Sequence, residues 1–183
     1  FFPIAGGTLN FIPNKVDETF FDNIKYEVEE TFFLEVEINN EKHNVVNDVV
    51  FGNGIMDYFH FEIKAMNEID DFKKFHTSAG GLCIATPLGS TAFSLNNGAP
   101  VLTSLQSEFV LLSSVVGNKN ILRKLNVNKE IRISVSGRDK CFIFLDGKAK
   151  IIEVTDEVII RRGERVRFFF TDLRAFELKR LGV

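Results

Sequence analysis

The chain has 183 residues, and its 22 Lys and Arg against 25 Asp and Glu give a formal net charge of −3. This length is enough to bury the core of one domain, and the slight acidity argues against a surface built to bind nucleic acid. The longest apolar stretches are too short to cross a bilayer, so we expect no membrane partner.

The two cysteines, Cys83 and Cys141, lack the spacing of a metal site and lie in apolar, strand-like stretches. We expect both to be small buried side chains without a disulfide between them. Free thiols of this kind fit a reducing compartment, and we therefore predict a cytoplasmic location.

Alternation of apolar and polar residues with a period of two runs through the sequence and predicts short β-strands. In FHFEIKA, for example, the Phe and Ile side chains share one face. The strands are expected, in chain order, at residues 26–37, 45–51, 59–65, 81–85, 109–115, 130–135, 141–145, 158–161 and 165–170.

Turn-forming residues separate these strands, and only two segments fit helices. The turns are expected at residues 39–40, 52–54, 136–139, 146–147 and 162–163. The short helices are expected at residues 68–75 and 91–97. Many short strands at this spacing predict a mainly β protein, a β-sandwich with one or two short helices.

The segment GLCIATPLGSTAFSLNNGAP, residues 81–100, combines a short strand, a tight turn and a helix start. Pro87 cannot continue a strand ladder, and Ser90 is expected to be the N-cap of the short helix that follows. Gly98 suits the position just beyond the helix end. The free amides of a helix N-terminus suit a phosphate or a nucleotide edge, although a capped turn in an ordinary domain has the same pattern.

Asn47 and Asp48 interrupt the apolar strand VVNDVVF. Two polar side chains in a buried strand need partners, or each costs about 1–3 kcal/mol. The pattern has two interpretations. The two residues belong to a binding site, or the middle of the strand meets solvent or a loop.

The string TPLGSTAFS, residues 86–94, resembles the T-P-x-G-S-T-A-Y-S motif of the NAD kinase family. The preceding GGLCIA is similar to the family's D-G-L segment, and the following NNGAP is similar to its S-A-G-G-P. Upstream, residues 26–38 resemble a family strand, and VVNDVVF lies where the family carries an Asn-Glu pair. Further similar segments are GGTLNFI at residues 6–12, FLDG at 144–147, RVRFFF at 165–170 and FELKRL at 176–181.

This resemblance covers nearly the whole chain but only the second domain of such an enzyme. It implies one NAD-binding domain over residues 1–183, with the β-sandwich fold of that domain. The enzymes phosphorylate the adenosine ribose 2′-hydroxyl of NAD to give NADP, using a divalent metal such as Mg²⁺ with ATP or, in some members, polyphosphate. Homodimers or homotetramers are usual in the family.

The family's G-G-D-G-T loop, which carries the phosphate cradle and the catalytic carboxylate, belongs to its first domain and does not occur in this sequence. We therefore expect no catalytic and no metal-binding residue in this chain. We also expect that the chain alone holds a dinucleotide without transferring phosphate.

The resemblance implies eight residues that bind NAD, three of which depart from the family pattern. Asp48 is one methylene shorter than the family's Glu, which contacts the ribose. Phe93 keeps the stacking surface of the usual Tyr without its hydroxyl, and Gly80 lacks the Asp carboxylate that contacts the nicotinamide side. The implied residues are Asn47, Asp48, Gly80, Ser90, Thr91, Ala92, Phe93 and Ser94.

Other features have two interpretations. Asp146-Gly147 fits a type I′ hairpin turn and also a turn near the family's cleft. The arginines at 161, 162, 165 and 167 fit a solvated strand face or a phosphate-facing cluster. A non-catalytic nucleotide-binding module and a related lipid-kinase-like domain remain alternative functions.

Overall fold

The structure is a computed structural model that describes residues 27–53, 58–66, 72–103, 105, 109–114, 122–138, 140–147 and 150–170. The chain divides into two compact units, residues 32–164 and a second one that joins residues 1–31 to 165–183. The first of these units carries the predicted site residues. The segments at 6–12 and 176–181 and the first part of the expected helix at 68–75 lie outside the described residues.

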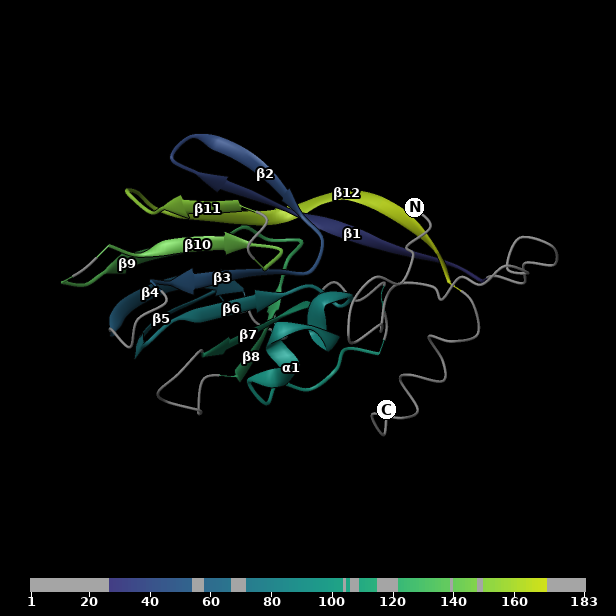
Figure 1. Cartoon of the computed structure of the whole chain (residues 1–183), viewed down its shortest axis with the longest axis horizontal. Helices are drawn as coiled ribbons and strands as arrows, with labels where there is room; N and C mark the ends of the chain where they lie inside the picture. Colours follow the sequence, from purple (N-terminus) through teal and green to yellow (C-terminus); the bar gives the residue numbers. More distant parts are fainter. Residues whose placement is uncertain are drawn as a thin grey trace. The chain divides into compact units, whose positions relative to one another are not determined.

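Strands dominate the described residues, as predicted (Figure 1). The strands are β1 (Glu27–Ile38), β2 (Glu41–Val45), β3 (Asp48–Gly52), β4 (Phe59–Met66), β5 (Phe72–Ala79), β6 (Leu82–Ala85), β7 (Phe109–Ser114), β8 (Leu122–Asn126), β9 (Ile131–Ser136), β10 (Phe142–Leu145), β11 (Lys150–Glu153) and β12 (Val158–Phe170). The helical pieces are the 3₁₀-helix η1 (Gly89–Thr91) and the one-turn helix α1 (Phe93–Asn96).

The strands form two six-stranded sheets, in the orders β2-β1-β12-β9-β4-β5 and β11-β10-β3-β6-β7-β8. Alternate side chains of each sheet enter a common core, in which Phe59, Phe61 and Ile63 of β4 are buried while His60 faces outward. The ring of Phe51, on β3, meets the ring of Phe61 edge-on at 6.0 Å between centroids. The predicted β-sandwich is therefore confirmed.

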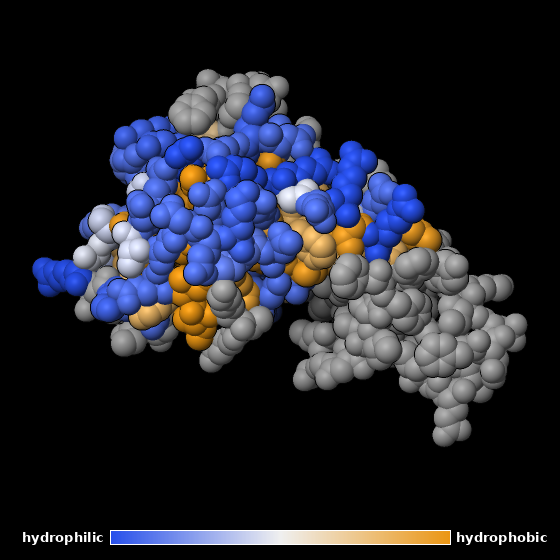
Figure 2. All heavy atoms as spheres, turned by 90° about the horizontal axis from the view of Figure 1, so that it is seen from above, coloured by the Kyte–Doolittle hydropathy of each residue, from blue (hydrophilic) through white to orange (hydrophobic). Residues whose placement is uncertain are grey.

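Hydrophilic residues cover most of the described surface that is visible in Figure 2, and hydrophobic residues form smaller patches there. The alternation along the strands explains this division, because each strand sends every second side chain away from the core. Among the described residues, no helix is long and apolar enough to cross a membrane.

The predicted strand at residues 45–51 is wrong in one respect that matters for the site. β2 ends at Val45 in one sheet, and β3 begins at Asp48 in the other. Val46 and Asn47 form the crossover between the sheets. The polar interruption of the apolar run therefore marks the point where the chain changes sheets.

Two further predictions of secondary structure are corrected. The expected helix at 68–75 is wrong over residues 72–75, because these residues begin β5 and pair with β4, from Met66↔Phe72 onward. The expected turn at 162–163 is wrong because β12 runs through it. Gly163 fits there because a Cβ would lie 3.0 Å from the Phe33 carbonyl oxygen. Strands β2, β5, β8 and β11 have no counterpart among the expected strands.

Candidate functional site

The crossover at residues 46–47 is tied to the end of β6 by Thr86. The Thr86 amide donates a hydrogen bond to the Asn47 carbonyl oxygen at 2.9 Å. The Thr86 hydroxyl donates to the Val46 carbonyl oxygen at 2.7 Å. Both carbonyl groups of the crossover are thus held by one residue of the motif.

The Gly-Ser-Thr-Ala bend lies directly against this crossover. A Cβ on Gly89 would lie 2.0 Å from the Asn47 carbonyl oxygen, so only glycine fits this close approach. The Gly89 amide donates to the Thr86 hydroxyl at 2.9 Å. The structure therefore brings the bend and Asn47 side by side, two segments that the resemblance assigns to one binding site.

The role expected for Ser90 is wrong. η1 and α1 have Leu88 and Ala92 at their N-caps, and neither cap makes a side-chain hydrogen bond. The buried Ser90 hydroxyl instead donates to the Pro87 carbonyl oxygen at 2.7 Å and accepts from the Leu102 amide at 2.9 Å. Ser90 holds the segment that follows α1 against the bend.

The remaining residues of the bend differ in their exposure. Ser94 is buried, and its hydroxyl donates to the Ser90 carbonyl oxygen at 3.3 Å. Thr91 and Ala92 are half-buried, and Phe93 exposes 39 % of its surface. Gly98 follows α1 with φ of 79°, as predicted for the position beyond the helix end. The side chains that reach the surface are therefore those of residues 91–93.

Gly80 does not join this group. A Cβ on Gly52, at the other end of β3, would lie 3.4 Å from the Gly80 carbonyl oxygen. Asp48 begins the same strand, and four residues of strand span about 13 Å. The structure of this chain therefore separates Gly80 from Asn47 and the bend.

Asp48 is a buried carboxylate, only 2 % exposed, at the first position of β3. Burial, together with the negative charge of Asp146, raises its pKa from an ordinary value of 3.8 to about 6. Hydrogen bonds from the amides of Gly147 and Phe93 oppose this rise. The carboxylate therefore links β3 to the first residue of α1.

Two buried oxygens of this site have no hydrogen-bond partner among the described residues, Asn47 Oδ1 and Asp48 Oδ1. A buried polar oxygen without a partner costs about 1–3 kcal/mol, so such groups in native proteins are usually satisfied by water or a ligand. These oxygens belong to adjacent residues, and the backbone amide of Phe93, whose side chain is exposed, donates to the Asp48 carboxylate. The arrangement offers an amide, a hydrogen-bond acceptor and an aromatic face.

The Asp146-Gly147 turn follows β10 with φ of 47° and 74°, the positive values that the predicted type I′ turn requires. Its position beside the crossover makes it part of the site as well. The Asp146 carboxylate accepts hydrogen bonds from the amides of Val46 and Asn47. Sequence reasoning missed this contact because about 100 residues separate the partners, and Asp-Gly alone indicates only a turn.

The two cysteines are free and buried, as predicted. Burial raises the pKa of both thiols, that of Cys141 to about 12. Thiols of this kind are inert packing groups rather than nucleophiles. In the part of the chain that the structure describes, no group of three or more His, Cys, Asp or Glu side chains could hold a metal ion.

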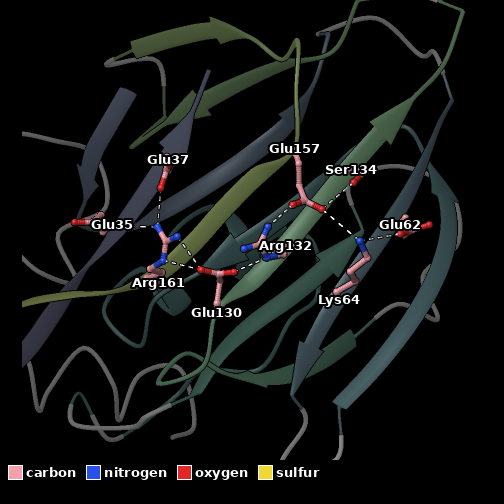
Figure 3. Close-up of polar contacts among 9 residues, drawn as sticks. All are labelled: Glu35, Glu37, Glu62, Lys64, Glu130, Arg132, Ser134, Glu157 and Arg161. Atoms are coloured by element: carbon pink, nitrogen blue, oxygen red, sulfur yellow. Dashed lines mark hydrogen bonds and ion pairs between the residues drawn. The ribbon is translucent and has the colours of Figure 1, made fainter. Parts of the chain in front are cut away.

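Arg161, Arg165 and Arg167 of β12 pair with glutamates on the solvated face of the strand, as one of the two interpretations held, whereas Arg162 points to the opposite face. Arg161 contacts Glu35, Glu37 and Glu130, and the contacts continue across the outer face of the sheet as an ion-pair ladder (Figure 3). Arg162 lies 4.5 Å above the Phe32 ring. The residues of the ladder are Glu35, Glu37, Glu62, Lys64, Glu130, Arg132, Ser134, Glu157 and Arg161.

A hollow of about 660 Å³ also opens on the outer face of this sheet. The two histidines that line it are solvent-exposed, and His60 shares a 2.6 Å hydrogen bond with Ser78. The lining includes no residue of the crossover or of the bend. The lining residues are His60, Phe61, Glu62, His76, Thr77, Ser78, Ser134, Val135 and Ser136.

Comparisons with known proteins agree on one family. A family model described as the ATP-NAD kinase C-terminal domain matches residues 17–170. The NAD kinase of Methanothermobacter thermautotrophicus is 30% identical over 91% of this chain and 62% of its own length. The NAD kinase of Magnetococcus marinus is 27% identical over 89% of this chain and 58% of its own. The chain thus spans about three-fifths of the length of these relatives.

Two solved structures share the fold. An NAD kinase from Archaeoglobus fulgidus in complex with ATP has a TM-score of 0.66 at 15% identity, covering 83% of this chain and 59% of the solved one. Yeast NADH kinase complexed with NADH has a TM-score of 0.68 at 18% identity, covering 91% of this chain and 54% of the solved one.

Proposed function

Because the chain belongs to the family of ATP-NAD kinase C-terminal domains, we propose that it is the dinucleotide-binding part of an enzyme that phosphorylates the adenosine ribose 2′-hydroxyl of NAD to give NADP. The observation that carries the proposal is the contact of the Gly89 bend with Asn47. It brings the two most specific motifs of the sequence to one place, beside two buried oxygens that have no hydrogen-bond partner in the described part of the chain.

The two unpartnered polar side chains and the residues of the bend each have a role in this proposal. The Asn47 side-chain amide pairs with the edge of the adenine, since an amide both donates and accepts. Asp48 accepts a hydrogen bond from a ribose hydroxyl through Oδ1. The half-buried Thr91 and Ala92 allow close approach of the nucleoside, and the Phe93 ring stacks on a base, which is worth about 1–3 kcal/mol.

Ser90 and Ser94 support the bend from within in this proposal. Their hydroxyls bond to backbone groups of the bend and of the segment after it. Gly80 contributes no carboxylate, and it lies at the far end of β3 from Asn47. We therefore assign contact with the adenosine half of NAD to this site and leave the nicotinamide half to groups outside it.

The phosphate donor in this proposal is ATP, with polyphosphate as a second donor and Mg²⁺ as the metal. The described residues contain no cluster fit to hold a metal ion, so the metal and the triphosphate are assigned to groups outside them. The same proposal places the enzyme in the cytoplasm as a homodimer or homotetramer. Phosphoryl transfer requires those additional groups, so the chain alone binds NAD without forming NADP.

Calorimetric titration of the 183-residue chain with NAD tests the proposal. We expect saturable binding that weakens about tenfold or more in Asn47→Ala and Phe93→Ala, a change of about 1.4 kcal/mol per decade. The controls are Asn44→Ala and Tyr58→Ala, which remove an exposed amide and an exposed ring to which the proposal assigns no ligand contact. Equal affinity in all five proteins would remove the site assignment.

A second assay separates binding from catalysis. The chain is incubated with NAD, ATP and Mg²⁺, and NADP is measured with an NADP-specific dehydrogenase. We expect none. Production of NADP would show that the chain carries its own catalytic groups and would contradict the division of roles proposed above.

A further inference from the structure

The Asp146 carboxylate lies under the crossover that carries Asn47. The Val46 amide donates to both carboxylate oxygens, at 3.1 Å and 3.0 Å, and the Asn47 amide donates to Oδ1 at 2.6 Å. These are charge-assisted hydrogen bonds, which are stronger than bonds between neutral groups. They join the turn between β10 and β11 to residues about 100 positions earlier.

The crossover is therefore held from two sides. Thr86 binds the carbonyl groups of Val46 and Asn47, and Asp146 binds their amides. All four backbone polar groups of this two-residue segment have a partner. Because every backbone polar group of the segment is bonded, these two residues hold the backbone of Asn47 and so set the direction in which its side chain leaves the chain.

The same turn also contacts Asp48. The Asp146 amide donates to the Asp48 carbonyl oxygen at 3.0 Å, and the Gly147 amide donates to the Asp48 carboxylate. One turn of two residues thus fixes the backbone of Asn47 and both the backbone and the side chain of Asp48.

We propose that Asp146 is a positioning residue for nucleotide binding: it orients Asn47 and Asp48 toward the nucleoside without itself touching the ligand. This inference rests on the proposed function. Its carboxylate has no free role in ligand contact, because its two oxygens already accept three bonds from the crossover.

A second effect of Asp146 makes the inference testable. Its negative charge is, after burial, the next largest cause of the raised pKa of Asp48. The amides of Gly147 and Phe93 lower the pKa of Asp48, and the charge of Asp48 in turn raises the pKa of the neighbouring Cys83 thiol. If Asp48 must be ionised to accept from a ribose hydroxyl, NAD affinity falls as the pH drops through about 6.

The experiment compares three variants by NAD titration between pH 5 and pH 8. Asp146→Gly removes the carboxylate and still fits the positive φ. Asp146→Asn removes the charge and keeps an oxygen at the position of Oδ1, which accepts from the amides of Val46 and Asn47. Asparagine also tolerates the positive φ of residue 146. The control is Asn40→Gly in the β1–β2 turn, an exposed position with φ of 65°.

We expect Asp146→Gly to weaken NAD binding about tenfold or more at pH 8 and Asn40→Gly to leave it unchanged. Asp146→Asn should bind NAD nearly as well as the parent at pH 8. Its affinity should begin to fall only at a lower pH than that of the parent, because the charge that raises the pKa of Asp48 is gone. A residue that only stabilised the fold, without a charge that acts on Asp48, would leave the pH midpoint of NAD binding unchanged.

The outcomes separate the two claims. If the parent chain does not bind NAD, the proposed function fails. If the parent binds and Asp146→Gly binds equally well, or if Asp146→Asn keeps the parent's pH midpoint, the inference about Asp146 is overturned. Should Asp146→Gly fail to fold, the pH midpoint of Asp146→Asn decides alone.

Discussion

Replacement of Asp48 by Asn should make the protein more stable at neutral pH and weaken its binding of NAD. Asp48 is 2 % exposed, and its pKa rises from 3.8 to about 6 on folding. A raised pKa means that ionisation of the carboxyl group costs more free energy in the folded protein than in the unfolded protein. The stability that Asp48 contributes is therefore fully present below pH 3.8 and is lost as the pH rises through about 6.

The size of the effect follows from the shift. About two pKa units correspond to about 3 kcal/mol at 1.4 kcal/mol per unit, which is the upper limit of the gain at pH 8. Asparagine keeps one oxygen for the amides of Gly147 and Phe93 but accepts less strongly than a carboxylate. It also offers a different group at the position of Oδ1, where the proposal places a ribose hydroxyl.

Urea unfolding of the parent and of Asp48→Asn at pH 4 and pH 8 measures the effect. We expect similar stabilities at pH 4 and a midpoint about 1 M higher for the variant at pH 8. NAD titration of the same samples should show weaker binding by the variant. A variant that is less stable at pH 8, or a difference that does not change with pH, would refute the reasoning.

Three other substitutions test separate contacts. Gly89→Ala should lower the free energy of unfolding by about 3 kcal/mol or more, because its Cβ would meet the Asn47 carbonyl oxygen at 2.0 Å. Urea unfolding measures this change, and an unchanged unfolding midpoint would contradict the close approach of the two segments. Ser90→Ala should cost about 1–3 kcal/mol, since the Leu102 amide loses its acceptor, whereas a neutral result would mean that water replaces the hydroxyl. Arg161→Gln should lower Tm by about 2–4 °C at low ionic strength and less in 1 M NaCl, and a salt-independent loss would exclude the ion pairs as its cause.

Much of the fold follows from local patterns in the sequence. The alternation in FHFEIKA predicts one buried and one solvated face, and β4 has both. The Asp-Gly dipeptide predicts the turn after β10. The pattern FKKF at residues 72–75 also fits the spacing of a helix, but the pairing of β5 with β4 overrides that local preference.

The candidate site was only partly predictable, for a physical reason. Asn47 and the Gly89 bend stand out as a polar break in an apolar strand and as a glycine in a tight turn, and both signals are local. The bonds of Asp146 to the crossover and of Ser90 to Leu102 join residues whose proximity depends on the finished sandwich. Local sequence carries no signal of such contacts.

The central claim is that an adenine nucleoside binds where the bend meets the crossover, and NMR tests it most directly. The chain is labelled with ¹⁵N, and spectra are recorded with increasing NAD. We expect saturable shifts of the Asn47 side-chain amide and of the backbone amides of residues 89–93. Shifts confined instead to the hollow around His60 and Ser78, with the Asn47 side chain unaffected, would contradict the account.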